Sequence, residues 1–79
     1  MDDNNIRAGL ESLRIQWRIE RGLKLSRKRE LMSQGGDMAG VRHDREYRIH
    51  RKAQRHFARL VRHLERELNR QRARGEQKK

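Results

Sequence analysis

The sequence contains no cysteine and no proline, and only three of its 79 residues are aromatic. The absence of cysteine excludes disulfide bonds, cysteine-based zinc sites and thiol chemistry. With no proline and few β-branched residues, but many Leu, Arg, Glu, Lys and Gln, the composition favours helices over strands. We therefore expect an all-α fold.

Large apolar residues are scarce as well. Leu, Ile, Val and Phe together occupy 15 positions, whereas Lys and Arg occupy 22 and Asp and Glu 11, which gives a net charge of +11. A chain of this length buries only about 60% of the surface that its unfolded form exposes. The chain is long enough for one domain at most, and the hydrophobic core of that domain must be thin. We expect self-association or a bound partner to supply further stability.

Long apolar runs are also missing. None approaches the roughly 18 residues that a membrane span needs. Asp2 and Asp3 follow Met1, in place of the basic residues and apolar run of a secretory signal. The sequence therefore predicts a cytoplasmic protein that does not enter a membrane.

Two helical patterns and one break organise a single domain over residues 1–79. Acidic and amide side chains at residues 2–5 can cap a first helix, and Asp37 or Asp44 can cap a second. Between them, a double glycine favours a reversal of the chain. The sequence predicts a first helix at about 3–34, a Gly-rich turn at about 35–43, a second helix at about 44–74 and a polar tail at 75–79.

The apolar residues of the first helix fall on two faces when residues are placed at about 100° intervals. One face holds Ile6, Leu10, Leu13, Trp17 and Leu31. The other, about 150° away, holds Ala8, Ile15, Ile19 and Leu23. Only one face can pack on the second helix, so a second copy of the chain can bury the other. We expect a helical hairpin that assembles as a homodimeric helical bundle.

The second helix has a single apolar face, made of Ile49, Ala53, Phe57, Leu60, Val61, Leu64 and Leu68. An alternative to the hairpin concerns Gly22 in the first helix. If Gly22 breaks that helix, Ser26 can cap a short helix through Leu31, and the chain folds as a three-helix monomer.

The most informative feature is a row of basic residues on the back of the second helix, which we call the basic comb. Its members lie within about 100° of arc, opposite the apolar face. No acidic residue occurs between Tyr47 and Leu64. Five like-charged pairs at i,i+4 spacing cost roughly 1 to 2.5 kcal/mol, which a bound polyanion would offset. The basic comb consists of Arg48, Arg51, Lys52, Arg55, Arg59, Arg62, Arg66 and Arg70.

Arginine supplies 17 of the 22 basic residues. Its planar guanidinium group makes bidentate contacts to phosphate, which Lys cannot make. The sequence therefore predicts a nucleic-acid-binding protein that contacts DNA or RNA phosphates. In size, charge and expected shape the chain resembles small regulators encoded by phages and plasmids. The alternative is an inhibitor or adaptor that docks the basic comb on an acidic protein surface.

Catalytic and metal chemistry find no support in the sequence. The four histidines, His43, His50, His56 and His63, lack the i,i+4 spacing of a helical zinc pair. No nucleophile elbow or phosphate loop surrounds any serine. We expect no enzyme activity, no metal and no cofactor. For the recognition of bases, isolated amides such as Gln54 and Asn69 are the few side chains able to contact base edges.

Overall fold

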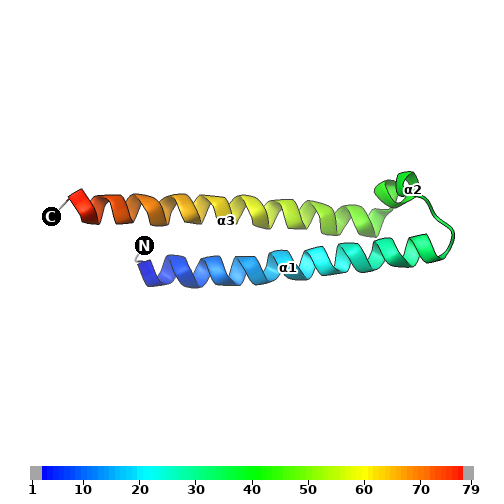
Figure 1. Cartoon of the computed structure of the whole chain (residues 1–79), viewed down its shortest axis with the longest axis horizontal. Coiled ribbons are helices and arrows are strands. Elements are labelled where there is room, and N and C mark those ends of the chain that lie inside the picture. The colour runs from blue at the N-terminus through cyan, green and yellow to red at the C-terminus, as the bar shows by residue number, and fades with distance from the viewer. Residues whose placement is uncertain (1–2, 78–79) are drawn as a thin grey trace.

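The computed structural model describes residues 3–77, with side chains as far as residue 75. Three helices make up this part of the chain: α1 (Asp3–Ser33), α2 (Met38–His43) and α3 (Arg45–Gln77). The two long helices lie side by side in opposite directions, and α2 sits at the closed end of the hairpin (Figure 1). The molecule measures 62 × 18 × 14 Å. The prediction of an all-α fold with two long packed helices is confirmed.

Helix α1 ends in a glycine motif that turns the chain back. Gly35 has φ +87°, a left-handed conformation that costs other residues energy. Its N–H donates to the carbonyl of Met32 at 3.1 Å, and the N–H of Gly36 donates to that of Leu31 at 3.0 Å. These two bonds form a Schellman motif. A Cβ on Gly36 would lie 2.8 Å from the Leu31 carbonyl oxygen, so both glycines are required by the turn.

The connection differs from the predicted turn at 35–43, because part of it is the short helix α2. Asp37 caps this helix by accepting a hydrogen bond from the Gly40 N–H at 2.8 Å. Val41 anchors it, with only 1% of its surface exposed. Asp44 then accepts from the Tyr47 N–H at 3.0 Å and begins α3. The two aspartates, offered as alternatives by the sequence, therefore cap one helix each.

Helix α3 also extends past its predicted end at residue 74, since its last described residue is Gln77. Gly75 was expected to begin a polar tail, but it does not adopt a positive φ. A single glycine without that conformation, and without a proline after it, costs a helix only about 1 kcal/mol. Of the predicted tail, residues 78 and 79 lie outside the described part of the chain.

The core is small and lies toward the open end of the hairpin. Ile6, Leu10 and Leu68 are buried together, with Val61 and Leu64 packed against them. The first apolar face of α1 therefore meets α3. Apart from Val41 at the closed end, the described chain buries no further apolar side chain to the same degree. Neither long helix holds a stretch apolar enough to cross a membrane within residues 3–77.

One predicted core residue of α3 is on the surface. Ile49 is 55% exposed. The next residue faces α1 in its place, because Nδ1 of His50 lies 2.6 Å from Oε2 of Glu20. Since successive helical residues are about 100° apart, Ile49 is turned away from the interface when His50 enters it.

Helix α1 runs without a break through Gly22. The three-helix alternative, which required a break there, is therefore wrong. The continuous helix leaves its second apolar face uncovered: Ile15, Ile19 and Leu23 are 46%, 48% and 45% exposed.

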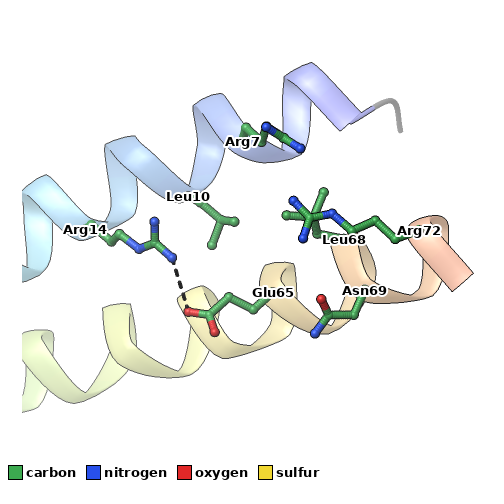
Figure 2. A pocket seen from close by; sticks show the side chains of 7 residues that line it. All are labelled: Arg7, Leu10, Arg14, Glu65, Leu68, Asn69 and Arg72. Atoms are coloured by element: carbon green, nitrogen blue, oxygen red, sulfur yellow. Dashed lines mark ion pairs between the residues drawn. The ribbon is translucent and has the colours of Figure 1, made fainter.

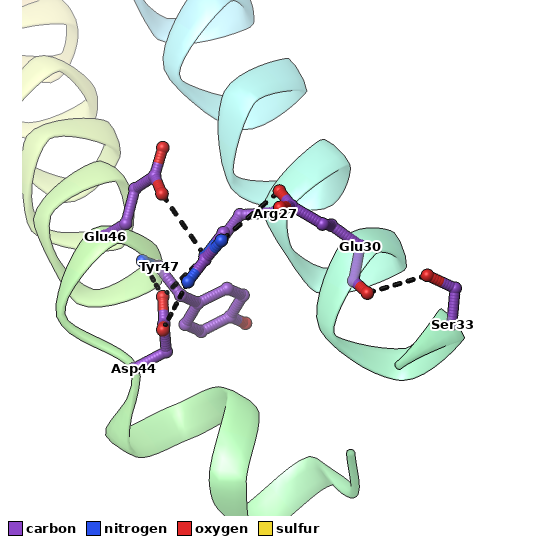
Figure 3. Close-up of polar contacts among 6 residues, drawn as sticks. All are labelled: Arg27, Glu30, Ser33, Asp44, Glu46 and Tyr47. Carbon is purple, nitrogen blue, oxygen red and sulfur yellow. Dashed lines mark hydrogen bonds and ion pairs between the residues drawn. The ribbon is translucent and has the colours of Figure 1, made fainter. Parts of the chain in front are cut away.

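A cluster of ion pairs fastens the closed end (Figure 3). Arg27 of α1 donates from Nε and Nη2 to the two carboxylate oxygens of Asp44, at 3.0 and 2.9 Å. Its guanidinium also lies 3.2 Å from a carboxylate oxygen of Glu30 and 3.2 Å from one of Glu46. The hydrogen bonds from Arg27, followed by that from the Tyr47 N–H, lower the pKa of Asp44 from 3.8 to about 2. Arg27 therefore joins the end of α1 to the start of α3.

This cluster predicts a loss of stability in acid. Because the pKa of Asp44 is lower in the folded chain than in the unfolded one, the ionised carboxylate contributes stability above about pH 4. That contribution disappears as the pH falls from 4 toward 2. Urea unfolding at several pH values should show a steeper acid loss for the wild type than for Asp44→Asn, which keeps a capping side chain but has no charge. Parallel losses in the two proteins would rule out this role for Asp44.

Candidate nucleic-acid interface

The basic comb lies along the outer side of α3. The apolar side of this helix packs on α1, and the comb is centred roughly 170° from it. Its eight members occupy an uninterrupted helix. Seven have exposed side chains, and Arg51 is half-buried. The members predicted from the sequence therefore share one accessible face.

Two acidic residues that could neutralise the comb are engaged elsewhere. Asp44 lies four residues before Arg48, but its carboxylate is held by Arg27 of α1 and by the Tyr47 N–H. Glu65 lies three residues after Arg62, but its carboxylate is 3.5 Å from Nη2 of Arg14. Helix α1 thus draws two acidic groups toward itself and away from the comb, one just before α3 and one within it.

The result is a row of cations with almost no internal partners. Among the described side chains, Arg70 is the only comb member in an ion pair, with Glu67 one turn away. A solvated helical face usually interleaves charges of both signs, because opposite charges at i,i+4 stabilise a helix. This face does not, so it remains available to an external anion.

A shallow hollow of about 660 Å³ adjoins the comb at the closed end of the hairpin. It adds two residues that the sequence prediction of the site missed, His43 from the end of α2 and Arg45 from the start of α3. Helical geometry places Arg45 only about 20° beyond the edge of the comb, so the spacing in the sequence was sufficient to predict that Arg45 lies next to it. His43 comes close through the path of α2. The comb members in the hollow are Arg48, Arg51, Lys52 and Arg55, and Ile49 also lines it.

A second hollow, of about 370 Å³, lies between the two long helices near the open end (Figure 2). Arg7 and Arg14 of α1 and Arg72 of α3 line it above the side chains of Leu10 and Leu68, beside Asn69 and Glu65. Figure 2 shows the Arg72 side chain extending across Leu68 into the space between the helices, while Arg7 lies along α1. Asn69, one of the two amides singled out in the sequence, therefore borders a basic surface shared by α1 and α3.

The aromatic residues are not arranged as a stacking platform. Trp17, Tyr47 and Phe57 are all half-buried. Arg21 lies over the Trp17 ring, 5.6 Å from its centroid, in a cation–π contact. The accessible chemistry of the surface is therefore that of guanidinium and ammonium groups.

The histidines do not form a metal centre in the part of the chain that the structure describes. No three His, Asp or Glu side chains gather there as a metal ion would require. His50 is turned toward Glu20 of α1, and the His56 ring lies 5.7 Å from the Phe57 ring. His43 is placed beside the comb, at the hollow of the closed end.

Comparison of the chain with protein-family models, with curated protein sequences and with solved structures gives no match. Its function must therefore be inferred from the chemistry of its own surface.

Proposed function

We propose that this protein binds nucleic acid, without catalysis, through phosphate contacts along the basic comb. The observation that carries the proposal is the lack of internal partners: seven of the eight comb members form no ion pair with any described side chain. Like charges in this arrangement destabilise a helix. A chain with so thin a core gains from a ligand that neutralises them.

The residue types and the length of the comb favour a nucleic-acid backbone. Seven of the eight members are Arg, which binds phosphate with bidentate geometry. The distance from Arg48 to Arg70 is 22 residue steps, or roughly 33 Å, close to one turn of B-DNA. With few amides at its edges, the surface is suited to positioning on phosphates more than to reading bases.

The proposal predicts a steep dependence of duplex affinity on salt. Each neutralised phosphate contributes about −0.9 to the slope of log K against log salt. If about five phosphates are contacted, a rise from roughly 50 to 200 mM salt weakens binding several hundredfold. Fluorescence anisotropy with a labelled duplex measures this slope, and a second duplex of unrelated sequence should bind about equally. A slope near zero, together with binding to an acidic polypeptide such as polyglutamate, would replace nucleic acid by an acidic protein as the partner.

We also propose that the protein acts as a homodimer. The side of α1 turned away from α3 carries no Lys or Arg from Asn4 to Ser33, although the chain has 22 such residues. We call it the non-basic face. It spans about 120° of arc, and all its residues are exposed. Its members are Asn4, Asn5, Ala8, Ser12, Ile15, Gln16, Ile19, Gly22, Leu23, Ser26, Glu30 and Ser33.

A second copy of the chain fits this face for two reasons. Two copies that each carry a net charge of +11 repel one another, and only a face without cations lets them approach closely. The face combines three half-exposed aliphatic residues, Ile15, Ile19 and Leu23, with small residues that permit close packing of helices. A two-fold contact would bury six such side chains and enlarge a core that is thin in one chain.

A further inference from the structure

The basic comb and the non-basic face lie on opposite helices of a single layer. Figure 1 shows α1 and α3 side by side, with no third long helix over either. The comb occupies the side of α3 away from α1, and the non-basic face occupies the side of α1 away from α3. The surface proposed to hold a second copy is therefore separated from the surface proposed to hold nucleic acid by both helices.

We propose that the dimer bridges two separate nucleic-acid duplexes, one on each comb. This inference rests on the proposed function, since it requires both phosphate binding by the comb and pairing through the non-basic face. In a dimer joined by α1, each α3 is on the outside, and its comb points away from the other copy. This holds whether the two α1 helices run parallel or antiparallel, because the comb lies opposite α1 in each chain.

One duplex cannot easily occupy both combs. To pass from one comb to the other it would have to turn back around a dimer built of two hairpins, each only 18 Å across. Duplex DNA has a persistence length of about 150 base pairs, and bending 20–30 base pairs by 40–90° already costs on the order of 1–6 kcal/mol. Binding a second duplex avoids this cost.

Charge favours the same outcome. Two duplexes repel each other, and a body of twice +11 placed between them opposes that repulsion. Each comb can neutralise the phosphates of its own duplex without competing with the other. The dimer would thus hold two segments of nucleic acid together, as a protein that folds or pairs DNA must do.

A bridging experiment tests the inference directly. One duplex, about three helical turns long, is fixed to beads, and a second, labelled duplex of the same length is added with the protein. We expect the labelled duplex to be retained only when protein is present. As the protein is raised further, retention should fall again, because excess dimers occupy the two kinds of duplex separately. Retention that only grows with protein would indicate general charge neutralisation and would overturn the bridging dimer.

Two variants locate the effect. Ile19→Asp places a charge in the non-basic face, and it should lose at least about nine-tenths of the retention. Its affinity for a single duplex should change by less than about threefold, because the new charge and the comb lie on opposite sides of a hairpin 18 Å across, and salt at about 0.1 M screens charges beyond about 10 Å. Met32→Asp is the control: Met32 is similarly exposed, at 43%, but lies on another side of α1. It should bridge as the wild type does. Circular dichroism checks that both variants remain helical. If either variant unfolds, the rise and fall of retention measured with the wild-type protein still tests the bridging dimer.

The outcomes separate this inference from the proposed function. A wild-type protein that fails to bind the duplex on the beads would overturn both. A wild-type protein that binds that duplex, with the salt dependence given above, but retains no labelled duplex would overturn the bridging alone.

Discussion

Changing Arg55, Arg59 and Arg62 to Glu is expected to abolish duplex binding while the hairpin remains folded. The three residues are exposed in the middle of the basic comb, and none has an ion pair among the described side chains. Their replacement removes three phosphate contacts and adds three repulsive ones. The slope of log K against log salt should become shallower by about three, and affinity at moderate salt should fall by at least about a thousandfold. Anisotropy titrations at several salt concentrations measure both quantities.

The helix itself should not suffer from this change. None of the three side chains belongs to the core, and the substitutions relieve like-charge pairs at i,i+4, such as Arg51 with Arg55. Helicity measured by circular dichroism should hold or rise. A loss of binding accompanied by a loss of helicity would mean that the comb serves the fold, which is contrary to the proposal.

A triple variant on α1 provides a charge-matched control. Arg18, Arg21 and Arg29 are exposed and form no ion pair with the described side chains, and their change to Glu alters the net charge by the same amount. Among the described contacts, this triple variant loses only the cation–π contact between Arg21 and Trp17. This variant should weaken binding by no more than about tenfold, because it removes only long-range attraction, which salt screens. Equal losses in the two triple variants would show that total charge, and no particular face, attracts the duplex.

The long helices were predictable because their signals are local. A 3.6-residue apolar period and a run of helix-forming residues need no tertiary partner to be read. The paired glycines marked the reversal for the same reason, since Gly35 supplies a positive φ that few other residues tolerate. The membership of the basic comb also follows from helical geometry alone, once α3 is continuous.

The closed end was harder to predict, because its structure depends on contacts between elements. Helix α2 is held by the burial of Val41, which no local pattern of six residues announces. The exposure of Ile49 follows from the contact of His50 with Glu20, a residue thirty positions away. Sequence spacing assigned Ile49 to the core because period alone cannot tell which of two neighbouring positions faces the partner helix.

The isolation of the comb is likewise a tertiary property. In the sequence, Asp44 and Glu65 stand at the right spacing to pair with Arg48 and Arg62. In the fold, Arg27 and Arg14 of α1 hold them. Spacing in the sequence therefore predicts more ion pairs within the comb than the fold contains.

The Ile19→Asp variant is expected to convert the dimer to a monomer. Ile19 lies at the middle of the non-basic face, and a dimer would bury two new carboxylates there, close to each other and without a counter-ion. Light scattering at micromolar concentration should give about twice the 9.6 kDa chain mass for the wild type and half of that for the variant. Because association stabilises the folded state by mass action, the wild-type Tm should rise with protein concentration and that of Ile19→Asp should not.

The Met32→Asp variant again separates a specific contact from a general effect of charge. It introduces the same carboxylate on α1 at a comparably exposed apolar position, 43% against 48% for Ile19, but outside the non-basic face. It should keep the dimer mass and the concentration-dependent Tm. A wild-type protein that scatters as a monomer, with a Tm independent of concentration, would contradict the dimer. In that case the exposed row of Ile15, Ile19 and Leu23 would have to be covered by a different chain, because a helix of mixed polarity gains stability chiefly by packing its apolar face.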